Sequence, residues 1–256
     1  MPARCRTRVP ELAAARLGGV TRLQIYGSVA ELTLDRLERR NALDIMTLDG
    51  ISTTLERLAD DNSVSVVIVT GDGGCFCAGL DRDELRSRDT STLQRIYEAS
   101  RRFHRAVVGF PKPLIAAVDG YALGTGFDLA VMCDIRIVTD RAIFAHPEVR
   151  LGGVPLFTPL KLIVGDGWAR RLCLDATPID AVTAERIGLV TDVVATDELR
   201  RRARDIATSV AQAPLTVLRE TKALFGANPD PQTWLVTDHD AVFESGRTIG
   251  RPAEET

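Results

Sequence analysis

Short apolar runs alternate with longer amphipathic stretches through the first half of the chain. Five runs are rich in apolar and β-branched residues: 22–26, 29–34, 64–70, 113–118 and 135–138. The first two are separated only by Gly27-Ser28, which predicts a hairpin. Residues 64–70 (VSVVIVT) and 113–118 (PLIAAV) are nearly continuous in apolar residues, which is typical of strands buried on both faces of a parallel sheet.

Helical periodicity occupies the stretches between and after these runs. Apolar residues recur at helical spacing over 47–60, and a polar helix is expected over about 91–109. This alternation of strand and helix predicts an α/β fold with right-handed crossovers. Beyond about residue 156 the pattern is mainly helical. The expected helices are 160–164, 169–174, 181–187, 197–212, 214–225 and 231–245, with one short strand at 189–194.

Composition places the chain among ordinary globular proteins. It has 256 residues, of which 45% are hydrophobic and 26% charged, enough to bury a core without disulfides or metal. The formal net charge of −3 gives no basic field for nucleic acid. No apolar run reaches the roughly 18–20 residues that span a bilayer, so we expect no membrane span.

The cysteines and the N-terminal residues bear on the compartment. The five cysteines are an odd number without paired metal-ligand spacing, which favours reduced thiols in a cytoplasmic protein. Abundant arginine with few lysines suggests a GC-rich bacterial genome. Residues 1–18 carry four arginines and one acid without a following apolar stretch, which argues against a secretory signal. We expect a disordered or start-site-derived extension there, with a transit peptide as the alternative.

Two glycine-containing turns follow the two most apolar runs. Ala78-Gly79-Leu80-Asp81 comes after the first run, and Gly124 opens a second turn after 113–118. Ligands bind at the carboxyl ends of strands in α/β sheets, and a helix that begins there aims free N–H groups at the ligand. Two N–H groups that converge on one oxygen stabilise an enolate or a tetrahedral oxyanion.

Each turn taken alone is explained equally well as an ordinary turn, in which the glycine only allows the chain to change direction. A Rossmann phosphate loop is a third interpretation of Gly124-Thr125-Gly126. It is disfavoured because the last glycine of that fingerprint and a suitably placed strand-end acid are both missing.

Four ordered segments resemble the crotonase (enoyl-CoA hydratase/isomerase) family. They are LDRLERRNALD (34–44), FCAGLDRDEL (76–85), KPLIAAVDGYALGTGFDLAVMCDIRI (112–137) and AERIGLVTDVV (184–194). The resemblance implies a ββα spiral core over residues 19–195 that processes an acyl-CoA thioester. It also implies a C-terminal helical region over 196–256, through which family members usually form trimers or pairs of trimers.

The resemblance also assigns roles to individual residues. It implies that the N–H groups of Leu80 and Thr125 form the oxyanion hole around the thioester oxygen. It places a further set of residues along the coenzyme A moiety: Arg40, Ala42, Ala78, Leu80, Asp81 and Gly124. A solvated surface arginine is an equally good interpretation of Arg40. No separate cofactor and no metal are expected, because coenzyme A enters as part of the substrate.

Two carboxylates decide which family reaction is expected. Asp128 and Glu148 fall where hydratases carry their catalytic glutamates, and hydration needs one group to activate water and another to protonate Cα. The resemblance therefore implies a 2-enoyl-CoA hydratase. The alternatives are an enoyl-CoA isomerase or another family reaction that uses Glu148 alone, and a non-catalytic acyl-CoA-binding protein. His104, His146 and His239 form no metal or nucleophile signature, and His146 is interpreted as a packed strand-end residue.

Three departures from the family pattern mark this chain. Asp128 is one methylene shorter than glutamate, which moves its carboxylate roughly 1–1.5 Å away from a bound water. Thr125 stands where the family has glycine. Residues 152–172 replace a glycine-rich segment with a bulkier one, which indicates either a different acyl-pocket wall or different core packing.

Overall fold

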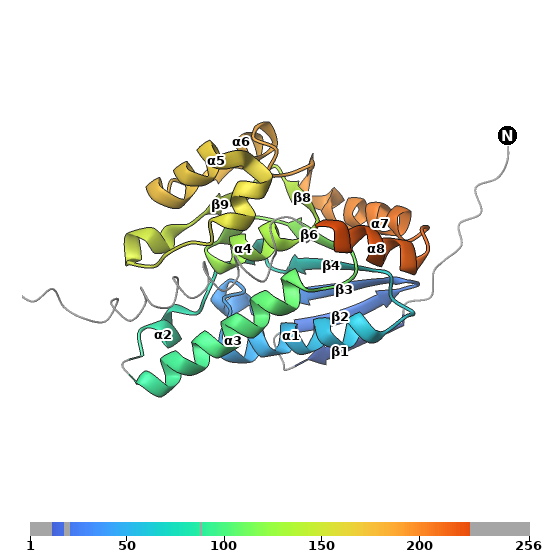
Figure 1. Cartoon of the computed structure of the whole chain (residues 1–256), viewed down its shortest axis with the longest axis horizontal. Helices are drawn as coiled ribbons and strands as arrows, with labels where there is room; N and C mark the ends of the chain where they lie inside the picture. The colour runs from blue at the N-terminus through green and yellow to red at the C-terminus, as the bar shows by residue number, and fades with distance from the viewer. Residues whose placement is uncertain (1–11, 18–20, 88, 226–256) are drawn as a thin grey trace, which may run out of the picture.

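The main sheet confirms the predicted α/β class. The computed structural model describes residues 12–17, 21–87 and 89–225 (Figure 1). Within them, seven strands pair in the order β1-β2-β3-β4-β6-β8-β11. Their bounds are β1 Leu12–Leu17, β2 Thr21–Tyr26, β3 Val29–Leu34, β4 Val66–Gly71, β6 Leu114–Val118, β8 Ile135–Thr139 and β11 Asp192–Val194. The first three strands are antiparallel, and the pairs from β3 onward are parallel.

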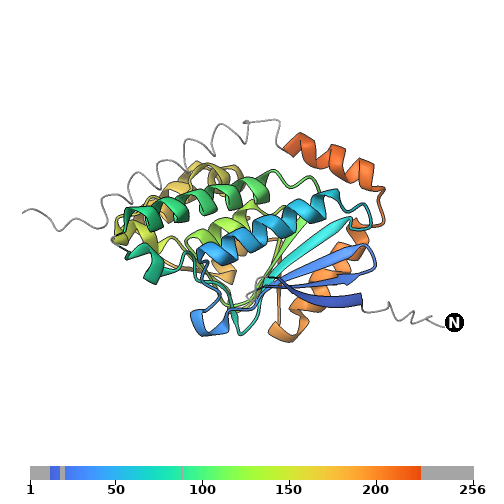
Figure 2. The same cartoon turned by 90° about the horizontal axis from the view of Figure 1, so that it is seen from below.

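Helices cover both faces of this sheet (Figures 1 and 2). The α-helices are α1 Ile45–Asp60, α2 Arg82–Leu85, α3 Thr90–Val108, α4 Thr125–Met132, α5 Thr158–Asp175, α6 Ala181–Arg186, α7 Leu199–Val210 and α8 Leu215–Phe225. The 3₁₀ helices are η1 Leu37–Arg39, η2 Pro147–Leu151 and η3 Thr196–Glu198. Val67 and Val69 of β4 face the core beneath α1 and α3, whereas Val66 and Ile68 pack toward α7. The continuous apolar run of β4 is therefore buried on both faces, as predicted.

A second sheet was not predicted. It contains β5 Cys75–Cys77, β7 Tyr121–Leu123, β9 Ile143–Ala145 and β10 Ile179–Asp180, in the order β10-β9-β7-β5. The pairs β5–β7 and β7–β9 are parallel. Strands of two or three residues are too short to show a period of two in the sequence, and only their tertiary pairing identifies them.

Two other expectations need correction or limitation, and one is confirmed. Residues 12–17, which we expected to be disordered, form an edge strand on β2, so the predicted extension does not hold for them. The two short helices expected at 160–164 and 169–174 are confirmed as the two parts of α5, because Gly165 interrupts its helical backbone with φ of 74°. The helix expected at 231–245 lies outside the described residues. None of the helices that the structure describes is long and apolar enough to cross a membrane.

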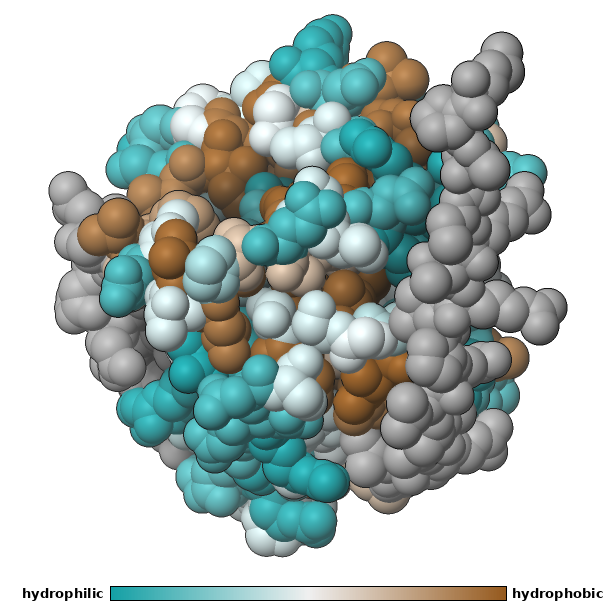
Figure 3. Space-filling model, turned by 90° about the vertical axis from the view of Figure 1, so that its right-hand side faces the viewer, coloured by the Kyte–Doolittle hydropathy of each residue, from teal (hydrophilic) through white to brown (hydrophobic). Residues whose placement is uncertain are grey.

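The outer surface is mixed in character. On the face shown in Figure 3, hydrophobic side chains surface in separate groups among hydrophilic ones.

Ion pairs also join the last helices to the sheet. Arg200 and Arg204 of α7 pair with Glu31, a β3 carboxylate that is 1% exposed. Buried carboxylates require such partners, so these contacts fix α7 on the sheet.

His104 on α3 makes the free energy of unfolding depend on pH. Its ring is buried, and Nδ1–H donates to the carbonyl oxygen of Ser100 at 2.7 Å. Burial lowers the pKa of His104 from 6.5 to about 4, and the hydrogen bond opposes this shift only in part. The folded chain therefore keeps His104 neutral in a pH range where the unfolded chain protonates it.

The stabilising contribution of neutral His104 is complete above pH 6.5 and is lost as the pH falls toward 4. We expect this residue to lower the free energy of unfolding by about 1.4 kcal/mol per pH unit through that window. Urea unfolding of wild type and His104→Gln at several pH values measures the effect. The variant should show a shallower slope, and an unchanged slope would contradict this assignment.

Candidate active site

The second sheet brings three separate segments to one edge. Because β5, β7 and β9 are parallel, their carboxyl ends point the same way, with Cys77 opposite Ala122 and Leu123 opposite Ala145. The chain after each strand carries predicted site residues: 78–81 after β5, 124–128 after β7 and 146–148 after β9. The N–H of Gly124 donates to Ala145 O at 2.9 Å and locks two of these ends together.

The first turn is held by residues 40–43. Ala78 N–H donates to Arg40 O at 3.1 Å, Leu43 N–H to Gly79 O at 2.8 Å, and Asp81 N–H to Leu43 O at 2.9 Å. Leu43 and Leu80 form an isolated parallel β-bridge, in which the hydrogen bonds to Leu43 come from the two neighbours of Leu80, Gly79 and Asp81. The N–H of Leu80 therefore faces the opposite side, and it has no hydrogen-bond acceptor among the described residues.

The second turn begins helix α4. Gly124 is the N-cap, with φ of 52° and ψ of −125°, and Thr125 is the first helical residue. The N–H groups of a first helical turn have no intrahelical acceptor, and that of Thr125 has none elsewhere in the described chain. The positive end of the helix dipole adds to the attraction for a negatively charged oxygen.

Gly79 shows how closely the two turns approach. A Cβ atom at Gly79 would lie 2.7 Å from Leu123 O and 3.6 Å from Thr125 N. The backbone of the first turn is therefore in direct contact with the start of α4. The N–H groups of Leu80 and Thr125 come from these two touching segments, which is the arrangement that an oxyanion hole requires.

Replacing Gly79 by alanine should destabilise the fold through this contact. Gly27 is the matched control, because it also has positive φ (60° against 88°) but its Cβ would meet nothing within 4 Å. We expect Gly27→Ala to cost about 1–2 kcal/mol of unfolding free energy from backbone strain. Gly79→Ala should cost about 1–3 kcal/mol more, from the clash with Leu123 O. Equal losses in urea unfolding would show that the two turns do not touch.

The two predicted carboxylates lie together. Asp128, in the first turn of α4, is 5% exposed, and Glu148 belongs to η2. One oxygen from each and a ring nitrogen of His146 all lie within 4.8 Å of one another. A Cβ atom at Gly124 would be 3.1 Å from Glu148 Oε2, so this carboxylate oxygen borders the second turn.

His146 is a member of the site that the sequence interpretation missed. Its ring is 0% exposed, and its centroid lies 4.7 Å from that of Phe127. Nδ1–H donates to Glu148 Oε1 at 2.8 Å, and Nε2 lies 3.9 Å from Asp128 Oδ1. Burial lowers the pKa of His146, but the hydrogen bond to Glu148 and the charges of Asp128 and Glu148 outweigh it, so the pKa lies above its usual range.

These three side chains fit hydrogen bonding better than metal binding. Ligand atoms on one Zn²⁺ ion lie roughly 3.4 Å apart, given bond lengths of about 2.0–2.2 Å. In this group His146 Nε2 lies 3.9 Å from Asp128 Oδ1, and the Nδ1 atom of His146 already donates to Glu148. Burial raises the pKa of the neighbouring Cys77 thiol to about 12, so this thiol stays neutral and is a poor nucleophile.

The residues assigned to coenzyme A border the first turn. Arg40 is exposed with φ of 52°, Ala42 is buried, and Ala78 is half-buried. The Asp81 side chain pairs with Arg36 at 2.6 Å and accepts from the N–H of Asp83, so it caps α2. The backbone of Asp81 is also engaged within the fold, since its N–H donates to Leu43 O and its carbonyl oxygen accepts from Leu85 N–H. Contact of these residues with coenzyme A stays a prediction.

The segment after the site contributes in part to the core. Leu156 is 1% exposed and packs with Val108 and Met132. Of the two explanations given for the bulkier segment 152–172, different core packing is therefore the one that applies to Leu156.

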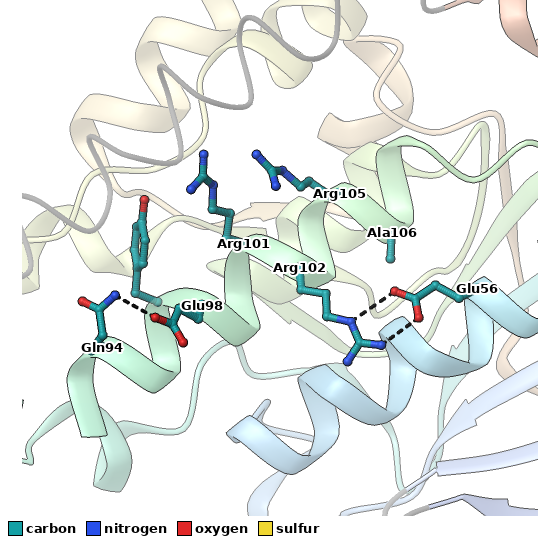
Figure 4. A pocket seen from close by; sticks show the side chains of 8 residues that line it. Glu56, Gln94, Glu98, Arg101, Arg102, Arg105 and Ala106 are labelled. Atoms are coloured by element: carbon teal, nitrogen blue, oxygen red, sulfur yellow. Dashed lines mark hydrogen bonds and ion pairs between the residues drawn. The ribbon is translucent and has the colours of Figure 1, made fainter. Parts of the chain in front are cut away.

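A surface pocket elsewhere on the molecule is separate from this site. It lies along α3 beside α1 and is lined by Glu56, Gln94, Tyr97, Glu98, Arg101, Arg102, Arg105 and Ala106 (Figure 4). Arg102 donates to Glu56 at 2.7 Å and ties α3 to α1, while Arg101 and Arg105 point away from that pair. None of the predicted site residues lines this pocket, so it does not bear on the catalytic chemistry.

Fold and site together define a protein that can hold an acyl oxygen against paired backbone N–H groups beside two carboxylates. A family model described as enoyl-CoA hydratase/isomerase matches residues 24–244. The chain belongs to this family, which confirms the resemblance found in the sequence.

Relatives and solved structures agree with this membership. The chain is 37% identical over 228 residues to the short-chain-enoyl-CoA hydratase of Clostridium acetobutylicum, covering 87% of each chain. It is 36% identical over 197 residues to the 2,3-dehydroadipyl-CoA hydratase of Escherichia coli, covering 75% of this chain and 76% of the relative. The crystal structure of an enoyl-CoA hydratase from Mycobacterium tuberculosis matches with a TM-score of 0.78 and 34% identity, over 90% of this chain and 99% of that one.

Proposed function

We propose that this chain is a 2-enoyl-CoA hydratase that adds water across the α,β double bond of an acyl-CoA thioester. The observation that carries the proposal is the meeting of two touching backbone turns with two carboxylates at one sheet edge. The names of the relatives support hydration over the other family reactions. Coenzyme A enters with the substrate, and the chemistry below uses no other cofactor.

The oxyanion hole activates the substrate. The thioester oxygen accepts from the N–H groups of Leu80 and Thr125, which draws electrons from the conjugated double bond and makes Cβ electrophilic. When water adds, negative charge grows on the same oxygen as the enolate forms. Because the two donors are fixed by the turns before substrate arrives, they stabilise this charge without reorganisation, typically by about 3–4 kcal/mol per donor.

The carboxylates divide the two proton transfers. Glu148 Oε2 borders Gly124 and hence the thioester end, which suits it to protonate Cα. Asp128 then takes a proton from the water whose oxygen bonds to Cβ. The hydroxyl ends on Cβ, the proton on Cα, and the enolate returns to a thioester carbonyl. A site with one acid and one base meets this need when the two groups have different protonation states.

Crotonyl-CoA and a 3-enoyl-CoA of the same length together test the proposal. The expected result is loss of the conjugated enoyl absorbance of crotonyl-CoA with formation of the 3-hydroxyacyl thioester. Conversion of the 3-enoyl-CoA to its 2-enoyl isomer without any hydration would favour the isomerase. Binding of both thioesters without turnover would favour the acyl-CoA-binding alternative.

A homotrimer or hexamer is also proposed, and light scattering of the purified chain measures it.

A further inference from the structure

A single arginine closes the end of α4 that lies away from the site. Arg136 is the second residue of β8, and its guanidinium reaches back to the C-terminal end of that helix. It donates to Ala130 O at 3.4 Å, to Val131 O at 3.3 Å and to Cys133 O. The last carbonyl groups of a helix have no N–H partner within it, and α4 has no basic residue in its own last turn. Arg136 therefore provides both the donors and the positive charge at this end.

Arg136 is a buried cation held by carbonyl groups. The residue is 7% exposed, and its Nε also donates to Leu189 O at 2.6 Å, just before β11. All of its hydrogen bonds within the described chain go to backbone carbonyl oxygens. Burial lowers the pKa of Arg136, but arginine starts from so high a value that it stays charged at neutral pH. Buried charges usually have a carboxylate partner, so a charge balanced by a helix end is unusual.

The opposite end of α4 carries one of the two proposed oxyanion donors. α4 has eight residues, so it is about 12 Å long, and its first N–H belongs to Thr125. In a helix this short, the partial negative charge of the last carbonyls weakens the positive potential at the first N–H groups. Residues 126–131 are buried, so little water screens this effect. A cation against the last carbonyls cancels the opposing charge.

We propose that Arg136 is a positioning residue for the oxyanion hole and acts on it from the far end of α4. This inference rests on the hydratase function proposed above. The guanidinium fastens the helix end to β8 and to Leu189, which keeps Thr125 in place against the first turn. Its charge also neutralises the negative end of α4, so the positive end acts more strongly on the enolate oxygen. No bond and no proton changes at Arg136 during the reaction.

The charge and the anchor have different expected sizes. The guanidinium and the thioester oxygen would lie roughly 15–18 Å apart, from the length of α4 and a hydrogen bond at each end. At an effective dielectric constant of about 20, a unit charge at that distance changes the stability of the enolate on the order of fivefold. Loss of the anchor adds to this, because a displacement of about 1 Å in a catalytic group can cost about a hundredfold.

Acetoacetyl-CoA reports enolate stabilisation without turnover. It has no double bond to hydrate, and its enolate, which places negative charge on the thioester oxygen, is distinguished from the keto form by ultraviolet absorbance. In Arg136→Gln the ratio of bound enolate to bound keto form should fall at least fivefold. For crotonyl-CoA, kcat should fall about 5- to 100-fold, with KM within about twofold. A folded Arg136→Gln enzyme with the wild-type enolate ratio and kcat would overturn the proposal.

The matched control is Lys112→Gln. Lys112 is fully buried, and its Nζ donates to Leu58 O and Asp61 O, so it closes the C-terminal end of α1 as Arg136 closes that of α4. No predicted site residue lies on α1. Lys112→Gln should lower the free energy of unfolding but keep the wild-type enolate ratio. An equal fall of that ratio in both variants would assign the effect to general loss of stability and overturn the proposal.

Arg136→Lys carries the test if Arg136→Gln does not fold. Lysine keeps the charge but lacks the planar fork that reaches several carbonyl groups at once. The enolate ratio should stay within about twofold of wild type, while the amide hydrogens of α4 exchange at least about tenfold faster and those of α1 do not change. Unchanged exchange in α4 would overturn the anchor. A wild-type chain that favours bound enolate, with the losses expected in the variants, but hydrates no enoyl-CoA would support this inference and overturn the hydratase function instead.

Discussion

Replacing Glu148 by glutamine is expected to lower kcat for crotonyl-CoA hydration on the order of 10²- to 10⁴-fold, because the acid that protonates Cα is lost. Glutamine has nearly the same size as glutamate and its amide oxygen can still accept from His146 Nδ1–H. KM should therefore change little, since the turns that hold the thioester are untouched. Steady-state kinetics over a range of crotonyl-CoA concentrations gives both constants.

The matched control for this variant is Glu98→Gln. Glu98 is an exposed residue on α3 whose side chain accepts from Gln94, and the same substitution there should leave kcat unchanged. If Glu148→Gln kept kcat within twofold of wild type, Glu148 would not be the acid. Asp128→Asn adds a further distinction, because hydration requires both carboxylates, whereas the isomerase alternative requires Glu148 alone.

Replacing Thr125 by proline is expected to lower kcat/KM by about 10²- to 10³-fold through loss of one oxyanion donor. Proline has no N–H, and its ring would occupy the place where that hydrogen points. The substitution suits the local backbone, because Thr125 is the first residue of α4 and proline is favoured there. Gly124 has φ of 52° and ψ of −125°, which is the mirror image of an extended conformation. Extended conformations are allowed before proline, and glycine adopts their mirror image equally readily because it has no Cβ.

Thr125→Ala is the control that keeps the N–H and removes the side chain. It should retain activity within a few-fold of wild type, and both variants should melt within a few degrees of the parent chain. A folded Thr125→Pro enzyme with nearly full activity would contradict the role of this N–H. Equal losses in both variants would assign the effect to the threonine side chain instead.

Much of the main sheet could be predicted because its strands carry a long local signal. β4 and β6 are apolar at nearly every position, since one face of each belongs to the main hydrophobic core and the other packs toward α7. The helix α1 shows one apolar face for the same reason. In these elements, burial on one face or on both faces determines the spacing of apolar residues, and that spacing can be recognised in the sequence.

The small sheet left no such signal, and it is the element that assembles the site. β5, β7 and β9 have three residues each, and they exist as strands because the chain on either side brings them together. β1 was missed for a related reason: the alanine-rich sequence LAAARL has weak strand propensity, and pairing with β2 decides its conformation. Tertiary contacts override local preference in both cases.

The site itself was predicted unevenly. Ordered motifs pointed to the turns at Leu80 and Thr125 and to the pair Asp128 and Glu148. The structure brings all four to one edge, and their catalytic roles stay predictions. His146 was interpreted as a packed residue, and it is packed, but it also hydrogen-bonds Glu148. A single histidine carries no spacing pattern, and its position two residues before Glu148 was the one available sign.

The most direct test of the whole account is a crystal structure of the Glu148→Gln enzyme with crotonyl-CoA bound. The account predicts that the thioester oxygen lies about 2.7–3.1 Å from both Leu80 N and Thr125 N, with Cα beside the substituted side chain and Cβ toward Asp128. A thioester oxygen bound away from both N–H groups would contradict it.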